Sequence, residues 1–553
     1  MTTSSPRRIP FLHRPPAPRP RGVRVGLAAL TSLASLAGVV VVTTSSAEGV
    51  PVTVTALRAD PAPRPSAAER SPDAPNIVTV MLDDVDVASV EFMPTVQRLR
   101  RQGATFDRHT ASYSLCCPSR STYLTGQYAH NHGIRGNFPP YGGYANLNTA
   151  ETLPVWLEKA GYATAHIGKY LNGYNALAEL RRQGIPPGWT EWYGSLDPFT
   201  YNFYNYVLNV NGRRTVFGRG AQNYQTDVYT DFALDFIDRR APKDAPFFLD
   251  VSYLAAHFEA RPGTTLNEAG DFEGSVDNEP TLGVPPVPAP RHRGMFAGAT
   301  VPRVPSYNEA DVSDKPADIV AKPRMTAAQR DYVDHWYQRR LESLQSADEG
   351  IAAIVKRLKK LGEWDDTYLI ITSDNGYQMG EHRIWLNKVD HYEPSTRLPL
   401  VILGPGVERG GTVRDWTSNV DIHATILDLA EARRPGATFP LDGVSLVPYL
   451  RDTDRKRGRV VVHEAYNTFG AEPDPTWQGV RVGRWKWISY RDGTRELYDV
   501  LGDPYELENL AQDPAYARVR ARLDRVLDIA GDCAGRACVI TGFGDDWGSR
   551  LVR

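Results

Sequence analysis

Cysteine, net charge and long apolar runs are all scarce in this chain. Only 4 of its 553 residues are cysteine, which excludes a scaffold built on disulfides. Lysine and arginine number 63 against 65 aspartates and glutamates, which leaves a net charge of −2. Because nucleic-acid-binding proteins show a basic excess, we expect no nucleic-acid partner. With 41% hydrophobic and 23% charged residues, most of the chain should fold around a core.

A single apolar run approaches membrane-spanning length, and it lies near the N-terminus. It extends from Val25 to Val42, follows several arginines and precedes small residues that end at Ala47. This order is typical of an export signal, so we predict that residues 1–47 direct the protein to the cell envelope or out of the cell. An uncleaved anchor is the alternative, because this run of 18 residues is long enough to span a bilayer. We expect no membrane segment in the remainder.

The rest of the chain divides by composition and pattern. Residues 48–74 are rich in proline and alanine and are predicted to form a linker. Between 75 and 460, strand and helix patterns alternate, which indicates an α/β domain with a large, mostly parallel sheet covered by helices. Strands are predicted at Asn76–Leu82, Ala163–Ile167, Phe247–Tyr253, Thr367–Thr372 and Leu398–Leu403, and helices at Pro94–Arg101, Leu153–Ala160 and Met325–Leu361.

Two further segments stand out. Residues 262–323 form a long insertion rich in proline and glycine, which either shapes a substrate cleft or is a passive surface loop. After residue 460 the pattern changes to short β-like runs such as Trp485–Tyr490, followed by a helix predicted over Pro514–Ile529. We therefore predict a smaller C-terminal α+β subdomain over residues 461–553.

Charged or polar groups follow each of four predicted strands. In open α/β sheets, ligands bind beyond the carboxyl ends of the strands, so these groups should meet at one sheet edge. They are Asp83 and Asp84 after the first strand, Lys169 after the second, His257 after the third, and Asp374 and Asn375 after the fourth.

The oxygen donors among these groups suit a hard metal ion. Asp83 and Asp84 are adjacent carboxylates, which repel each other unless a cation lies between them. With Asp374 and Asn375 they form a donor set that favours Ca²⁺, with Mg²⁺ as the second choice, over Zn²⁺. The alternatives are a turn or helix cap at Asp83-Asp84 and a simple turn at Asp374-Asn375-Gly376.

The segment from Cys116 to Gly126 carries the strongest signal. Its sequence is Cys-Cys-Pro-Ser-Arg-Ser-Thr-Tyr-Leu-Thr-Gly. Pro118 suits the first turn of a helix, whose free N–H groups attract an anion, and Arg120 adds a bidentate donor for a tetrahedral oxyanion. Because an unpaired thiol is vulnerable to oxidation in an exported protein, we expect special chemistry at the first cysteines.

This segment resembles the sulfatase signature, Cys-x-Pro-Ser-Arg followed after three residues by Leu-Thr-Gly. The resemblance extends over roughly Asn76 to Leu510 and implies the alkaline-phosphatase-like fold of that family. It also implies that a formylglycine-generating enzyme oxidises Cys116 to formylglycine, whose aldehyde hydrate is the nucleophile. Cys117 occupies the variable position of the signature.

The resemblance assigns further roles by position. Gly168-Lys169 and the Gly380-Glu381-His382…Lys388 segment match elements of the family, as does His257 after the central strand. The implied Ca²⁺ ligands are Asp83, Asp84, Cys116, Asp374 and Asn375. The implied catalytic residues are Cys116, Arg120, Lys169, His257 and Lys388.

Within the family, the sequence looks like the N-acetylglucosamine-6-sulfatase and arylsulfatase branch. Cys-Cys-Pro-Ser-Arg and the run from Gly168 to Asn172 carry that likeness. One departure concerns Leu171, which stands where many arylsulfatases have a histidine credited with deprotonating the covalent intermediate. Asn172 cannot act as a base, so the resemblance leaves the base unassigned.

We therefore predict a sulfuric ester hydrolase that releases sulfate from a sulfated sugar or an aryl sulfate. Lys169 and Lys388 would stabilise oxyanion charge, and His257 with Lys388 would protonate the leaving alcohol. The alternatives are a phosphonate or phosphate ester hydrolase on the same fold, and a non-catalytic binder of sulfated glycans if Cys116 stays unmodified.

The other two cysteines lie close together near the C-terminus. Cys533 and Cys538 would form a small disulfide loop in an oxidising compartment, and two free thiols are the alternative.

Overall fold

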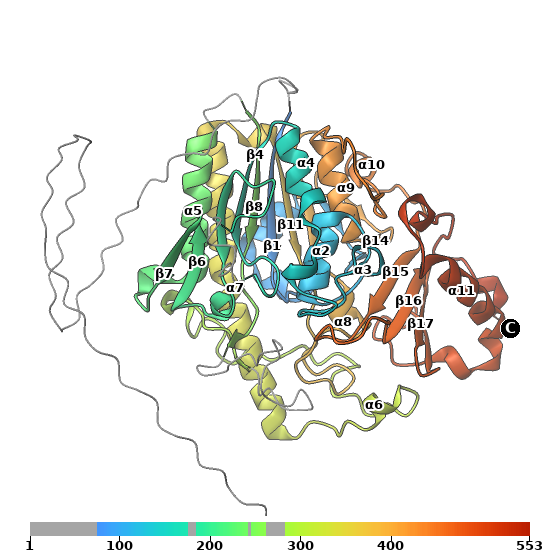
Figure 1. Ribbon diagram of the computed structural model, residues 1–553. Coiled ribbons are helices and arrows are strands. Elements are labelled where there is room, and N and C mark those ends of the chain that lie inside the picture. The colour runs from blue at the N-terminus through green and yellow to red at the C-terminus, as the bar shows by residue number, and fades with distance from the viewer. Residues whose placement is uncertain (1–73, 175–183, 242–244, 261–282, 553) are drawn as a thin grey trace, which may run out of the picture. The chain divides into compact units, whose positions relative to one another are not determined.

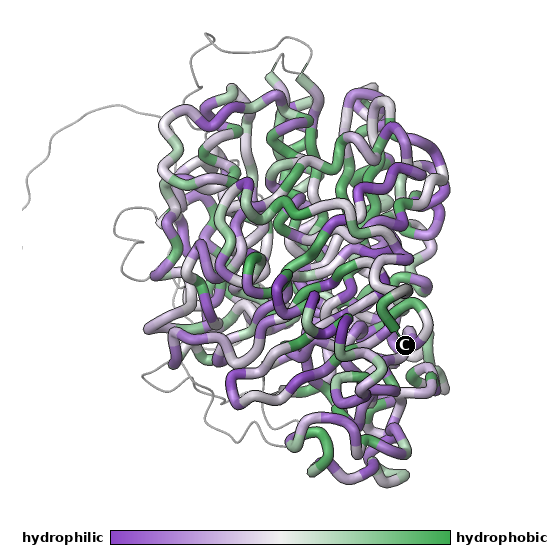
Figure 2. The backbone as a smooth tube through the Cα atoms, turned by 90° about the vertical axis from the view of Figure 1, so that its right-hand side faces the viewer, coloured by the Kyte–Doolittle hydropathy of each residue, from purple (hydrophilic) through white to green (hydrophobic). Residues whose placement is uncertain are grey.

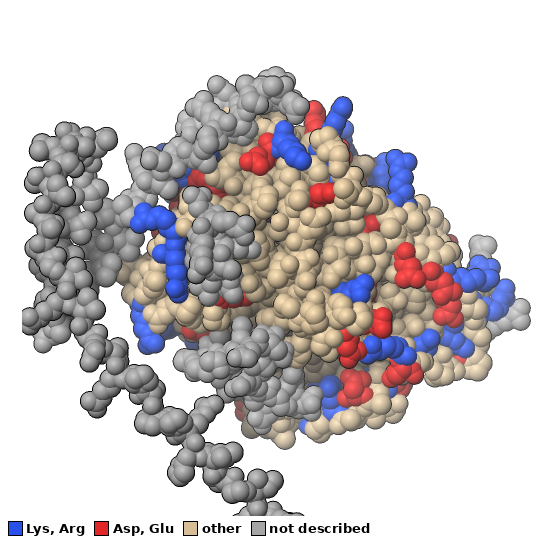
Figure 3. All heavy atoms as spheres, in the orientation of Figure 1, with Lys and Arg blue, Asp and Glu red and all other residues tan. Residues whose placement is uncertain are grey.

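A computed structural model describes residues 74–552, apart from 175–183, 242–244 and 261–282 (Figure 1). The predicted export signal, the linker up to residue 73 and the first part of the insertion lie outside the described residues. None of the helices within the described ranges has the length and hydrophobicity needed to cross a bilayer. Acidic and basic side chains are interspersed on the face that Figure 3 presents.

The main sheet has ten strands. Its centre, β11-β1-β8-β4-β5, is parallel throughout, as predicted. On either side, β12 and β2 and the β6-β7 hairpin run antiparallel to their inner neighbours, which the sequence patterns did not indicate. The order across the sheet is β13 (Thr412–Val413), β2 (Ala104–Phe106), β12 (Leu400–Leu403), β11 (Thr367–Ser373), β1 (Asn76–Leu82), β8 (Phe247–Ser252), β4 (Ala163–Gly168), β5 (Glu191–Ser195), β6 (Tyr206–Val210) and β7 (Arg213–Phe217).

Helices cover both faces of this sheet because its central strands are apolar on both sides. In β1, Val78 and Val80 belong to the core on one face, and Ile77 and Met81 belong to the core on the other. Hydrophobic stretches along the chain are green in Figure 2. The first face is covered by α1 (Pro94–Arg100), α5 (Gln225–Arg240) and α7 (Ala327–Leu361), and the second by α2 (Cys116–Thr125), α4 (Leu153–Lys159) and α9 (Val420–Leu429).

The longest helix, α7, begins two residues later than predicted. Thr326 accepts a hydrogen bond from the Gln329 backbone and the Gln329 side chain accepts one from the Thr326 backbone, so this capping box fixes the first turn. The helix ends at Gly362, whose φ of 80° is the left-handed conformation typical of a helix end. Its 35 residues place Tyr337 and Arg340 near the functional edge of the sheet.

Beyond residue 460 a second, antiparallel sheet forms, as predicted for the C-terminal part. It comprises β15 (Val461–Ala465), β16 (Trp477–Val482), β17 (Trp485–Tyr490) and β18 (Arg495–Asp499), with α11 (Ala517–Ala530) packed against it. The helix predicted from Pro514 is split into a 3-10 turn and α11. The Cys533–Cys538 disulfide is present, with an S–S distance of 2.03 Å. The boundary at 460 stays a prediction.

The described part of the insertion is less irregular than predicted. β10 (Gly283–Val284) pairs with β9 (Glu259–Ala260), and a short helix, α6 (Ala317–Val320), lies near the end of the segment. Val301 belongs to a small apolar cluster with Met325 and residues of α7. The segment from 283 onward therefore packs against the domain.

His130 joins the helix α3 (Ala129–His132) to the C-terminal part. Its Nδ1 lies 3.0 Å from a carboxylate oxygen of Glu464 in β15, and its Nε2 lies 2.9 Å from the backbone oxygen of Cys533. Burial alone would lower the pKa of His130, but the Glu464 carboxylate outweighs it and raises the pKa from 6.5 to about 9. The protonated ring can donate both hydrogen bonds, whereas the neutral ring can donate only one.

This pair predicts a pH-dependent stability. A raised pKa in the folded state contributes stability that is complete below pH 6.5 and is lost as the pH rises through about 9. The difference corresponds to about 3 kcal/mol. Urea unfolding at several pH values should show this loss in the wild type and not in His130→Gln. His335→Gln, which changes an exposed histidine of α7, should still lose stability as the pH rises. If the free energy of unfolding fell equally with pH in His130→Gln, the stabilising role of the His130–Glu464 pair would be refuted.

Candidate active site

The predicted site residues converge at one edge of the main sheet. Asp83 and Asp84 follow β1, Lys169 follows β4, His257 follows β8, and Asp374 and Asn375 follow β11. Arg120 lies in the second turn of α2, and Lys388 arrives from the loop between β11 and β12. Metal-competent atoms of Asp83, Asp84, Cys116 and His257 all lie within 4.8 Å of one another. The structure therefore brings all nine predicted residues together, and all nine are buried.

Cys116 is the first residue of α2. Its Sγ lies 2.8 Å from the Lys388 Nζ and 3.9 Å from an oxygen of Asp83. Only 1% of its surface is exposed, and burial raises the pKa of the thiol to about 11, against the opposing effect of Lys169 and Lys388. The unmodified thiol is therefore protonated at neutral pH and is a poor nucleophile.

Three cations face the carboxylates around Cys116. The Lys169 Nζ lies 2.5 Å from Asp83, the Arg120 Nε lies 2.8 Å from Asp374, and Lys388 forms an ion pair with Asp84. Burial would lower the pKa of both lysines, but Asp83 for Lys169 and Asp84 for Lys388 raise each pKa above its usual value. Both lysines therefore stay cationic inside the protein.

Gly168 explains why a glycine precedes Lys169. Its φ is +107°, and a Cβ at this position would lie 2.1 Å from the backbone oxygen of Ser252 in the neighbouring strand. Only glycine allows this close approach, which sets the direction in which the chain leaves β4 toward Asp83.

The donor set fits a bound cation. Asp84 Oδ2 and Asn375 Oδ1 are buried and have no hydrogen-bond partner among the described residues. The Asn375 amide nitrogen donates to the other Asp84 oxygen over 2.7 Å, which leaves the Asn375 oxygen free to act as a ligand. Burial, and then the nearby Asp374, raise the pKa of Asp83 to about 7. An added cation would relieve both the unpaired oxygens and this repulsion.

His257 is held in one tautomer. Its Nδ1 lies 2.9 Å from the backbone oxygen of Phe258, and because a carbonyl can only accept, Nδ1 carries the proton. Nε2 lies 3.7 Å from Asp84 and faces the site. The ring also packs against Tyr201, with centroids 4.9 Å apart.

Sequence patterns missed several residues that build this site. Arg340 of α7 donates to the backbone oxygens of Asp84 and Ala256, and Asn419 donates to Ser119 over 2.9 Å. Tyr201 lies under the Lys169 ammonium, with the Nζ 4.9 Å from its ring centroid. These residues lie on elements distant in sequence and belong to no motif, so only the structure reveals them.

No base stands near Lys169 at the position where many arylsulfatases have a histidine. Leu171 is buried in the apolar core of the second face and cannot take a proton. The Asn172 amide nitrogen donates to the Tyr201 hydroxyl over 2.7 Å. The proton acceptor that this position provides in many arylsulfatases is therefore missing here.

Comparison with known families identifies the chain. The sulfatase family model matches residues 75–432, and the model for the C-terminal part of N-sulphoglucosamine sulphohydrolase matches residues 380–530. The chain belongs to the sulfatase family. The predicted family and the predicted class of enzyme, a sulfuric ester hydrolase, are therefore confirmed.

Individual relatives agree with this assignment. An arylsulfatase of Volvox carteri is 33% identical over 505 residues, covering 84% of this chain and 75% of the relative. The N-acetylglucosamine-6-sulfatase of Homo sapiens is 30% identical over 420 residues, covering 74% of this chain and 70% of the relative. A protein solved in complex with its substrate D-glucosamine-2-N,6-O-disulfate superposes with a TM-score of 0.64 at 23% identity, covering 82% of this chain and 97% of that protein. At that identity the superposition confirms the sulfatase fold and says nothing more.

Proposed function

We propose that this sulfatase releases inorganic sulfate from a 6-sulfated glucosamine-type sugar by means of a formylglycine made from Cys116. The observation that carries the proposal is the setting of Cys116, which lies 2.8 Å from the Lys388 ammonium, with Lys169 and Arg120 nearby. The sugar is inferred from the relatives that act on glucosamine derivatives.

The side chains provide a binding site for the sulfate group. When formed, an aldehyde hydrate at position 116 would supply the nucleophilic oxygen. Arg120, Lys169 and Lys388 carry positive charge in a buried setting, where it stabilises developing oxyanion charge more strongly than in water. Tyr201 packs against both Lys169 and His257, so it keeps their positions relative to each other fixed.

A metal ion is the second inferred component. Asp83, Asp84, Asp374 and Asn375, with position 116, would hold Ca²⁺, which would supply further positive charge beside the sulfate oxygens. Asp374 is already oriented for this role, because it accepts from the Arg120 side chain and from the backbone N–H groups of Asp84 and Asn375.

Protonation of the leaving alcohol falls first to Lys388, with His257 beside it. Burial, against the effect of Asp84, holds the pKa of His257 well below 6.5, and Nδ1 donates to Phe258, so Nε2 has a free lone pair and must take up a proton before it can pass one to a substrate oxygen. Lys388 is cationic and carries protons beside position 116. The two groups face Asp84 from different loops, so the carboxylate orients both.

Maturation and location complete the proposal. The N-terminal segment would export the protein, and a formylglycine-generating enzyme would act on Cys116 before the enzyme works on sulfated carbohydrates or aryl sulfates. No nucleic acid or membrane is expected among its partners beyond the N-terminal signal.

Mass spectrometry of the tryptic peptide His109–Arg120 tests the nucleophile directly. We expect the thiol of Cys116 to be replaced by an aldehyde, with Cys117 intact. The same preparation should hydrolyse N-acetylglucosamine 6-sulfate and 4-nitrophenyl sulfate faster than 4-nitrophenyl phosphate. Faster turnover of phosphate or phosphonate esters would favour a phosphate or phosphonate ester hydrolase. Tight glycan binding by an unmodified protein, without sulfate release, would favour a non-catalytic binder of sulfated glycans.

Chelation tests the metal. Removal of Ca²⁺ with EGTA should abolish sulfate release and lower the melting temperature, because Asp83, Asp84 and Asp374 then repel one another. A ligand present at about 100 times its dissociation constant contributes about 2.7 kcal/mol to stability. Added Ca²⁺ should restore both properties at a lower concentration than Mg²⁺. Unchanged activity after chelation would rule out a required metal.

A further inference from the structure

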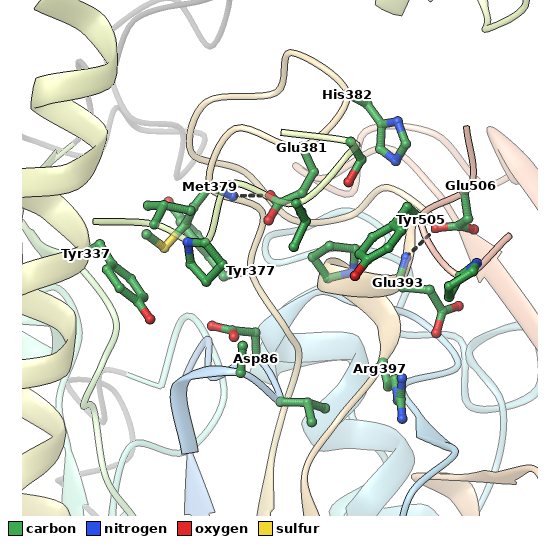
Figure 4. Close-up of a pocket in the computed structure, with 18 of the residues that line it drawn as sticks. Asp86, Tyr337, Tyr377, Met379, Glu381, His382, Glu393, Arg397, Tyr505 and Glu506 are labelled. Atoms are coloured by element: carbon green, nitrogen blue, oxygen red, sulfur yellow. Dashed lines mark hydrogen bonds between the residues drawn. The ribbon is translucent and has the colours of Figure 1, made fainter. Parts of the chain in front are cut away.

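A cavity lies on the α7 side of the active site. Its volume is about 310 Å³, and its walls come from segments far apart in sequence, including α7, the insertion, α8 (Glu393–Thr396) and the loop before α11 (Figure 4). Of the catalytic and metal residues described above, none belongs to its lining. The cavity therefore does not contain the sulfate-binding groups, although Asp86 and Tyr377 in its lining each lie two residues beyond a predicted metal ligand.

The cavity wall carries one carboxylate that lacks a cationic partner within the described ranges. Glu91 pairs with Arg100 over 2.5 Å, Asp86 lies 3.5 Å from Arg340, and Glu393 and Glu506 are held by Arg481 and Lys486. Glu381 accepts the backbone N–H of Met379 over 2.7 Å, and its own backbone N–H also lowers its pKa. Burial, and the nearby Asp86, raise the pKa of Glu381 to about 7. A cation placed here would therefore find an uncompensated carboxylate.

A buried hydroxyl in the same wall also lacks a partner. Tyr337 is only 3% exposed, and its hydroxyl has no hydrogen-bond partner among the residues that the structure describes. Figure 4 shows this hydroxyl extending from α7 toward the cavity on the side of the Asp86 carboxylate, while the Glu381 carboxylate faces the Met379 backbone higher in the view. A buried polar group left without a partner is unfavourable, so a ligand that pairs with it is favoured.

Aromatic and apolar side chains form the rest of the wall. Tyr337, Tyr377 and Tyr505 present rings, and Val301, Val304 and Met379 present apolar groups. Aromatic rings attract organic cations, and apolar groups favour a carbon skeleton over a hydrated metal ion. Arg397 belongs to the lining, and Arg340 lies beside it, 4.6 Å from the Tyr377 ring centroid. Each already has an acidic partner, Asp107 and Asp86 respectively.

We propose that this cavity binds a compact organic molecule that carries a protonated primary amine. An ammonium group has three N–H donors. The Glu381 carboxylate and the Tyr337 hydroxyl offer acceptors, and Asp86, whose oxygens already accept from the Ser89 backbone and hydroxyl, has further lone pairs to offer. The carbon skeleton packs against the tyrosine rings and the apolar groups of the insertion. An amino sugar and an alkylamine both have this chemistry.

Isothermal titration calorimetry on the full, Ca²⁺-loaded protein tests the proposal. The probes are 1,4-diaminobutane and glucosamine, each beside a neutral counterpart, 1-butanol and N-acetylglucosamine. We expect an amine to bind at least about tenfold more tightly than its counterpart, which corresponds to 1.4 kcal/mol. Binding of both amines would show that the cavity accepts amines in general. Binding of glucosamine alone would show that its ligand is an amino sugar. Equal binding of amine and counterpart, or no binding at about 10 mM, would overturn the proposal.

Variants locate the binding. Glu381→Gln keeps the acceptor for the Met379 N–H but removes the charge, so the dissociation constant for the amine should rise at least about tenfold. Tyr337→Phe should raise it about threefold to tenfold, which provides an independent test if Glu381→Gln folds poorly. Glu472→Gln, the same charge change at an exposed position paired with Arg491, should leave it unchanged. Wild-type affinity in both Glu381→Gln and Tyr337→Phe would refute the site.

Discussion

Cys116→Ser should lower kcat for 4-nitrophenyl sulfate at least about 10⁴-fold. A serine has no thiol to convert to an aldehyde, and its single hydroxyl cannot replace an aldehyde hydrate. The surrounding charges remain, because Lys169, Lys388 and Arg120 keep their carboxylate partners. Substrate should therefore still bind, and the loss should appear in kcat rather than in KM.

Cys117→Ser is the matched control. Cys117 is equally buried, but its side chain belongs to the apolar core that also holds Tyr123 and Leu171. We expect this variant to keep most of its activity and to retain the aldehyde at position 116. Similar losses in the two variants would mean that the cysteines support the fold and that Cys116 is not the nucleophile.

Lys388→Met should lower kcat/KM about 10³-fold. The Lys388 ammonium contacts both Cys116 and Asp84, and it is the strongest of the neighbouring groups that lower the pKa of Asp84 against the effect of burial. Without it, the site loses an oxyanion-stabilising charge, and Asp84 loses its closest cation. Leaving one partner of a buried ion pair alone costs about 3–5 kcal/mol. In urea unfolding without Ca²⁺, the free energy of unfolding of Lys388→Met should therefore fall by a similar amount.

Lys315→Met separates catalysis from stability. Lys315 is also buried and pairs with Asp314 over 3.0 Å, but it lies outside the active site. We expect this variant to lose stability while the folded fraction keeps its kcat and KM. If Lys388→Met behaved in the same way, with normal turnover per folded molecule, Lys388 would have a purely structural role.

The residues at the strand ends could be predicted because the information is local. Each buried strand shows as an apolar run, and the group that follows it, such as Asp83 or Lys169, must lie at the carboxyl edge of a parallel sheet. The Cys116 segment could be identified for a similar reason, since a helix start and its cysteine are adjacent in sequence. The four strand ends therefore predicted six of the nine site residues, whereas Cys116 and Arg120 came from the helix-start segment and Lys388 from the family resemblance.

Contacts between distant segments could not be predicted in this way. Arg340 reaches the Asp84 loop from a residue 256 positions away, and its own helix shows only an amphipathic pattern. Leu398 was predicted to begin a strand, but its N–H bonds to the backbone of His109, and the main-sheet strand starts at Leu400. Edge strands such as β6 and β7 depend on neighbours that no local pattern specifies.

The burial of Cys116 bears on when the proposed conversion of this residue to formylglycine could take place. In the folded protein this side chain is closed off by Lys388 and Asp83, which come from loops far from it in sequence. The proposed maturation enzyme would therefore reach it only while the chain is still open, before the strand ends assemble around α2. If conversion is required, rapid folding would trap an inactive protein, and slower assembly at this edge would favour a higher yield of active enzyme.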